Sequence, residues 1–181
     1  MSPPPSVKAL ILLFLSLTLA FAEQTEPLSH SSNLVDKVCK QTKYYDFCVR
    51  QLDSNPARAK ADLAGLGVIA IDQGIAKAKS TFSYIQELQN KTENPSLLQA
   101  LGDCSELYVD AIDQLEDSKR SIELKDYADA NMWVSASMAD SDTCEEGFAE
   151  QEEALPSPLS KNNSQLSKLG SIALAIIKLL K

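Results

Sequence analysis

Four carboxylates in the middle of the sequence have the types and the spacing that could do chemistry. Glu106, Asp110, Asp113 and Asp117 are separated by four, three and four positions, so on a helix they would share one face. Acid–base catalysis needs a desolvated carboxyl with a raised pKa, and the outside of a helix bundle offers no pocket for one. The row is therefore either a solvated face or a recognition face, where a basic partner would relieve the repulsion between like charges.

Other catalytic or metal-binding patterns are missing from the sequence. The single histidine, His30, lies in a polar segment with no group to orient it for nucleophilic catalysis. The four cysteines are expected to form bridges, which leaves neither a thiolate nucleophile nor a tetrahedral zinc site. No Gly-rich phosphate loop or dinucleotide fingerprint occurs. We therefore expect a binding protein with no catalytic residue, no metal and no cofactor.

The first 22 residues have the pattern of a cleaved signal peptide. Lys8 precedes an apolar run over residues 9–19, and Ala20-Phe21-Ala22 matches the cleavage pattern. The run is too short to span a membrane, so we expect export and no membrane attachment after cleavage. Glycosylation triplets begin at Asn90 and Asn162, as an exported chain allows. The net charge of −8, without a basic stripe, argues against nucleic acid as a partner.

Apolar residues recur at helical spacing in four segments of the remaining chain. The first lies between the breakers at 55–56 and 94–95, and the others cover about 96–118, 122–153 and 163–180. Four such stripes are best buried in an all-α, up-down-up-down four-helix bundle. Residues 32–40 and 43–52 are predicted to form two short helices. The expected organisation is therefore a helical hairpin at 29–58 followed by the bundle at 59–181, with 29–181 as one domain.

The elements also indicate how the cysteines pair. Four cysteines in an exported chain imply two disulfides and allow three pairings. Helix phase favours Cys39–Cys48 within the hairpin, and Cys104–Cys144, because both of the latter lie on apolar stripes of neighbouring helices. Trp133 is predicted to pack between helices, with a role as an exposed partner anchor as the alternative. The apolar stretch 169–180 is predicted to be a core helix rather than a lipid-anchor signal, because Lys178 interrupts it.

Several blocks of sequence carry a family resemblance. They are Val38-Cys39-Lys40-Gln41-Thr42 with Tyr45-Asp46-Phe47-Cys48, residues 61–67, Asp103-Cys104-Ser105-Glu106 with residues 108–111, and Asp126-Tyr127 with residues 135–138, 142–144 and 147–148. In this order, with the cysteines in register, they resemble the plant invertase and pectin methylesterase inhibitor family over residues 34–180. The resemblance implies a bundle preceded by a hairpin, with the first cysteine bridged to the second and the third to the fourth.

The resemblance also implies a function. It predicts a secreted, non-catalytic inhibitor in the cell wall or vacuole that binds one-to-one over the active-site cleft of an acid invertase or a pectin methylesterase. Some invertase inhibitors carry Pro-Lys-Phe near the start of the third helix, where this chain has Lys125, Asp126 and Tyr127 without the proline. The row from Glu106 to Asp117 could instead mimic acidic pectin. Both sets are candidate partner-binding residues, and the alternative is a non-inhibitory ligand-binding or structural protein.

Overall fold

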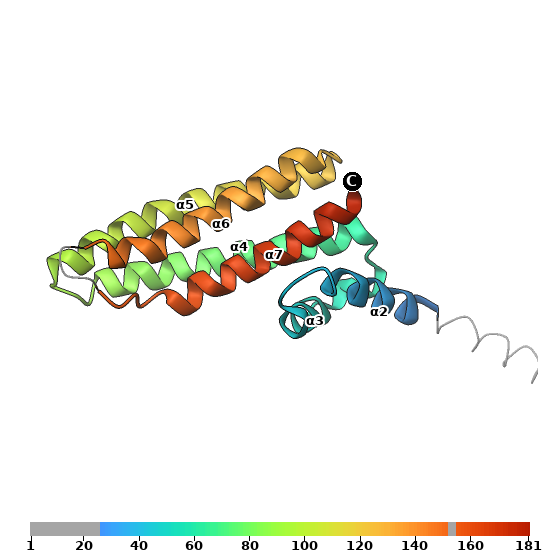
Figure 1. Cartoon of the computed structure of the whole chain (residues 1–181), viewed down its shortest axis with the longest axis horizontal. Helices are drawn as coiled ribbons and strands as arrows, with labels where there is room; N and C mark the ends of the chain where they lie inside the picture. The colour runs from blue at the N-terminus through green and yellow to red at the C-terminus, as the bar shows by residue number, and fades with distance from the viewer. Residues whose placement is uncertain (1–25, 152–154) are drawn as a thin grey trace, which may run out of the picture.

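The computed structural model describes the backbone of residues 26–151 and 155–181, and side chains from residue 33 onward. The predicted signal peptide and the side chain of His30 lie outside this part of the chain. Within it the protein has six α-helices, one short 3-10 helix and no strand (Figure 1). The all-α prediction is confirmed.

Four long helices form the bundle. They are α4 (Leu63–Gln89), α5 (Pro95–Glu123), α6 (Tyr127–Ala149) and α7 (Ser160–Leu180). Each helix packs against its neighbour in sequence, and α7 returns to pack against α4, which closes the up-down-up-down bundle. Figure 1 shows the four helices running side by side along the long axis of the molecule. The predicted architecture is therefore correct.

Side chains at the helix starts explain where three of these helices begin. Asp62 accepts a hydrogen bond from the Gly65 backbone N–H at 2.8 Å, and Asn94 accepts one from Leu97 at 3.0 Å. Asp126 caps α6 in the same way. Such caps satisfy backbone N–H groups that the helix itself leaves unpaired, and each contributes about 1 kcal/mol.

The predicted boundary between the second and third bundle helices was wrong. The sequence placed it between Ser118 and Ile122, whereas α5 continues to Glu123 and α6 begins at Tyr127. The chain reverses at Lys125, whose φ of 61° lies in the left-handed region. Glycine usually occupies such a position, but here the residue is a lysine. The sequence therefore has no Gly or Pro at this point that would have marked the turn.

The hairpin consists of α2 (Glu26–Cys39) and α3 (Tyr45–Asp53), followed by the 3-10 helix η1 (Pro56–Lys60). The first helix begins earlier than the predicted residue 32, and η1 was not predicted. Helix α2 packs against α7, and α3 packs against α4, so the hairpin leans on one side of the bundle (Figure 1). It shares one hydrophobic core with the bundle through Val38 and Leu52.

Two disulfides join the elements as helix phase indicated. Cys39 is bonded to Cys48 with a Cα–Cα distance of 5.5 Å, and Cys104 to Cys144 with one of 4.9 Å. The first closes the hairpin and the second ties α5 to α6 inside the core. The C-terminal apolar stretch is a core helix as predicted, with Ile172 and Ile176 fully buried. No helix in the described part of the chain combines the length and the apolar character needed to cross a membrane.

Candidate inhibitory surface

The carboxylate row lies on the outside of α5. Glu106, Asp110 and Asp113 are exposed, and Asp117 is half-buried and forms an ion pair with Arg120 one turn later. On the opposite side of the same helix, residues such as Tyr108 are fully buried. At 1.5 Å per residue, the row extends about 16 Å along the helix. The predicted common face exists, and it is a surface rather than a pocket.

Helix α6 adds a carboxylate that the sequence did not single out. Asp140 is half-buried beside Gln114, and its Oδ2 atom has no hydrogen-bond partner within the described residues. Burial raises the pKa of the Asp140 carboxyl, the Gln114 amide opposes that shift, and the charge of Asp110 adds to it. We call the five residues Glu106, Asp110, Asp113, Asp117 and Asp140 the acidic face.

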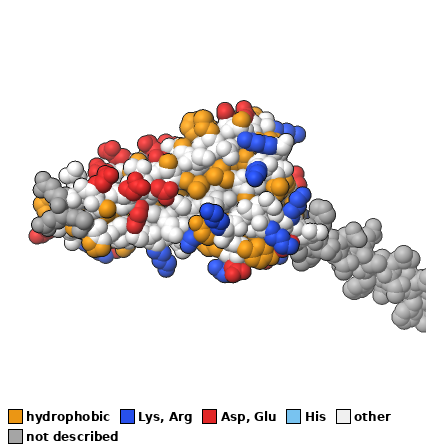
Figure 2. Space-filling view, viewed as in Figure 1, with side chains coloured by type: hydrophobic (Ala, Val, Ile, Leu, Met, Phe, Trp, Pro, Cys, Tyr) orange, Lys and Arg blue, Asp and Glu red, His pale blue; other side chains and the backbone are white. Residues whose placement is uncertain are grey.

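The surrounding surface is strongly negative. Helices α5 and α6 together carry twelve acidic and two basic residues. Figure 2 shows the acidic side chains gathered along this pair of helices, with Lys and Arg concentrated around the hairpin. Repulsion within such a surface is relieved when a positively charged partner binds, and the field of the surface speeds the encounter.

Ion pairs neutralise the neighbouring side of α5, and within the acidic face they involve only Asp117, which pairs with Arg120. Lys79 lies 2.8 Å from Glu116, and Lys119 lies 2.7 Å from Asp72, so both pairs join α4 to α5. The Lys79 hydrogen bond lowers the pKa of Glu116. Within the described residues, Glu106, Asp110 and Asp113 have no basic partner at ion-pair distance. These three carboxylates are therefore available to another molecule.

The second set of predicted contact residues forms the turn between α5 and α6. Leu124 is 80% exposed, and Lys125 is exposed beside it at the end of the bundle. Asp126 is occupied as the cap of α6, and Tyr127 is half-buried and packs against the core. By helix rise, Lys125 lies about 12 Å beyond Asp117 along α5. The turn therefore lies at the end of the bundle, beyond the acidic face, and the two sets of residues do not form one cluster.

The remaining candidates have separate positions. Asn90 is exposed at the C-terminal end of α4, whereas Asn162 is half-buried and its Nδ2 donates to Thr81 Oγ1 at 3.3 Å. Trp133 is half-buried on α6, so it is neither fully packed between helices nor fully exposed as a partner anchor. In the described part of the chain, no group of three or more His, Cys, Asp or Glu side chains is arranged to hold a metal ion.

A buried polar network joins the first half of α5, the C-terminal end of α6 and the N-terminal end of α7. The Tyr108 hydroxyl of α5 donates to Asn163 Oδ1 of α7 at 2.7 Å, and Asn163 Nδ2 donates to Glu145 Oε2 of α6 at 2.7 Å. Hydroxyls of Ser157 and Ser160 also donate to Glu145. The network fixes the position of α6 relative to α5, and α6 carries Asp140.

The fold and this surface define a disulfide-linked helical bundle that presents unneutralised carboxylates from two adjacent helices. Residues 33–176 match the family described as plant invertase/pectin methylesterase inhibitor, and the chain belongs to this family.

Similar proteins carry both target names. A "Putative invertase inhibitor" from Platanus orientalis is 37% identical over 156 residues, which cover 83% of this chain and 91% of that protein. A "Pectinesterase inhibitor" from Actinidia deliciosa is 34% identical over 169 residues, covering 93% of this chain and 91% of that one. The crystal structure of mutant form A of a pectin methylesterase inhibitor from Arabidopsis superposes with a TM-score of 0.71 at 26% identity, covering 81% of this chain and 97% of the other.

Proposed function

We propose that this protein is a non-catalytic inhibitor of a pectin methylesterase, and that it lays the acidic face over the active-site cleft of that enzyme. One observation carries the choice of target: Glu106, Asp110 and Asp113 form an exposed row on the outside of α5 with no basic partner among the described residues. Membership of an inhibitor family supplies the kind of function, and the row supplies the chemistry of the contact.

The choice of a methylesterase follows from the charge of its product. Removing methyl esters from pectin leaves a polymer of carboxylates, so the cleft of such an enzyme must accommodate a line of negative charge. A rigid helix with carboxylates spread over about 16 Å presents a similar line without a bond to hydrolyse. Since the helix is already ordered, little conformational entropy is lost on binding.

The expected complex contains one inhibitor and one enzyme. The acidic face belongs to a single chain and lies on one side of the bundle, so one copy suffices to cover one cleft. The predicted signal peptide supports a location in the cell wall, with the vacuole as the other destination expected from the family resemblance.

An acid invertase is the second candidate target, because of the turn between α5 and α6. Lys125 projects there from a left-handed backbone conformation, next to the exposed Leu124. The similar Platanus protein carries the invertase name. In this case the turn, not the acidic face, would enter the cleft.

Titrating purified residues 23–181 against each enzyme type at mildly acidic pH tests the proposal. Asp110→Asn/Asp113→Asn should raise the inhibition constant for the methylesterase about tenfold, or about 1.4 kcal/mol. The loss should shrink at high salt, because salt screens exposed charges. The matched control Asp46→Asn/Glu93→Gln removes two exposed charges elsewhere and should change little.

Lys125→Gln separates the two targets. If the target is a methylesterase, this variant should inhibit as the unaltered protein does. Loss of invertase inhibition in Lys125→Gln, with no effect of the paired Asp changes, would assign the chain to invertase instead. Absence of inhibition of both enzymes at micromolar concentration would refute the inhibitor function itself.

A further inference from the structure

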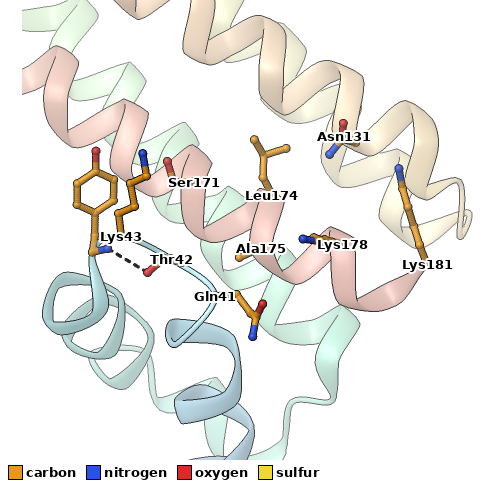
Figure 3. A pocket seen from close by; sticks show the side chains of 10 residues that line it. Gln41, Thr42, Lys43, Asn131, Ser171, Leu174, Ala175, Lys178 and Lys181 are labelled. Atoms are coloured by element: carbon orange, nitrogen blue, oxygen red, sulfur yellow. Dashed lines mark hydrogen bonds between the residues drawn. The ribbon is translucent and has the colours of Figure 1, made fainter.

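A groove lies between the hairpin and the C-terminal half of α7, away from the acidic face. It has a volume of about 470 Å³, within the range of pockets that hold small ligands. The turn between α2 and α3 forms one wall, the last turns of α7 form the floor, and Asn131 of α6 closes the far end (Figure 3). Ser171 of α7 adds a hydroxyl between the walls.

The lining of the groove is basic. Lys43 extends from the hairpin turn toward α7, Lys178 comes from the last turn of α7, and Lys181 directly follows that helix (Figure 3). Among the described residues, no Asp or Glu side chain lines the groove. None of the three lysines has an acidic partner at ion-pair distance in residues 33–151 and 155–181. On a protein with a net charge of −8, this concentration of unpaired positive charge is a local exception.

The hairpin wall is held in place before any ligand binds. Cys48 is bonded to Cys39 across the turn, and the Thr42 hydroxyl donates to the Cys39 carbonyl at 2.9 Å. Thr42 also accepts a hydrogen bond from the Tyr44 backbone N–H. Lys168 of α7 lies over the ring of Tyr44, 5.5 Å from its centre, and so ties the turn to α7. Lys43 is therefore carried on a rigid support.

We infer that this groove binds a carboxylated polysaccharide, a polyuronate chain. Lysine ammonium groups attract its carboxylates, while the Asn131 amide and the Ser171 and Thr42 hydroxyls can hydrogen-bond to sugar hydroxyls. A hollow of this size takes a few sugar units, whereas a stable protein partner needs a contact of about 1,200 Å² or more. The groove involves the hairpin and α7, so its occupation leaves the acidic face of α5 and α6 open.

Binding of de-esterified oligogalacturonate to residues 23–181 tests this inference by isothermal calorimetry at mildly acidic pH. We expect binding that weakens with added salt, and much weaker binding of the fully methyl-esterified oligomer. Lys43→Gln/Lys178→Gln should reduce the affinity about tenfold, or about 1.4 kcal/mol. Lys91→Gln/Lys161→Gln removes the same charge from exposed positions that do not line the groove, and should bind as the unaltered protein does.

Two further comparisons make the result decisive. Lys43→Arg/Lys178→Arg keeps the charge and should retain binding. Lys43→Gln/Lys178→Gln should still inhibit its enzyme on a soluble substrate, while Asp110→Asn/Asp113→Asn should still bind the oligomer. The inference is overturned if the unaltered protein does not bind the oligomer, if both Lys-to-Gln pairs lose affinity equally, or if the methyl-esterified oligomer binds as well. If Lys43→Gln/Lys178→Gln loses enzyme inhibition but still binds the oligomer, the groove contacts a protein and the inference is also overturned.

Discussion

Replacing Tyr108 by Phe removes one hydroxyl from the buried network and keeps the ring. The Asn163 side-chain oxygen then loses the donor that lies 2.7 Å away. Tyr108 is 0% and Asn163 2% exposed, so water cannot take the place of the hydroxyl without opening the bundle. A buried acceptor left without a donor costs about 1–3 kcal/mol.

This cost converts into a measurable shift in melting temperature. For a chain of this size, 1 kcal/mol corresponds to about 2–4 °C, so a mid-range loss of about 2 kcal/mol lowers Tm by about 4–8 °C. Burial raises the pKa of the Tyr108 phenol beyond its ordinary range, so the phenol remains protonated and the loss should not vary with pH in neutral solution.

Differential scanning calorimetry of the oxidised protein measures the effect. The control is Tyr84→Phe, because Tyr84 is 37% exposed and its hydroxyl makes no hydrogen bond within the described residues. This control should shift Tm by only about 1 °C or less, as most exposed substitutions do. A Tyr108→Phe protein that melts together with Tyr84→Phe would refute the idea that the network stabilises the junction of α5, α6 and α7.

Four further outcomes are expected. Asp140→Asn should raise Tm at neutral pH but not at a pH below the ordinary pKa of Asp. Burial raises the pKa of this carboxyl, so its ionised form destabilises the folded state only where the pH is high enough to ionise it. An equal gain in Tm at both pH values would contradict this. Gly170→Ala should destabilise by about 1–3 kcal/mol, since a Cβ there would lie 2.5 Å from Met138 Cγ. Gly102→Ala, where nothing lies within 4 Å, should stabilise by up to about 1 kcal/mol, and urea unfolding of both variants checks the opposite signs. Mass spectrometry of the protein secreted from plant cells should find a glycan on the exposed Asn90 and none on Asn162, whose amide nitrogen donates to Thr81; a glycan on Asn162 would show that this contact does not form.

Helical periodicity predicted the bundle well because each long helix buries one continuous stripe. Cys104 and Cys144 occur on such stripes, so their pairing followed from the phase of two neighbouring helices. The turn at Lys125 was missed because it depends on the backbone conformation of a single residue and not on a repeated apolar pattern. The backbone reverses at a left-handed residue that is not glycine, and the apolar periodicity placed the start of the third helix near Ile122, before the Asp126 cap.

The row on α5 could be predicted because its members are close in sequence. Asp140 could not, since its place beside Gln114 depends on how α6 crosses α5. The same applies to the basic groove: Lys43 and Lys178 come from opposite ends of the chain, and only the packing of the hairpin on α7 brings them together. Residues that meet across elements carry no local signal, even when the elements themselves are predicted correctly.

The uneven distribution of charge gives the molecule an electric dipole across the bundle. Helix α7 has three lysines and no acid, while α5 and α6 carry the large excess of negative charge. In the field of a fixed polyanion such a dipole experiences a torque that turns the hairpin and α7 toward the polymer. The same rotation directs the carboxylates of α5 away from the polymer, toward the solvent from which an enzyme arrives.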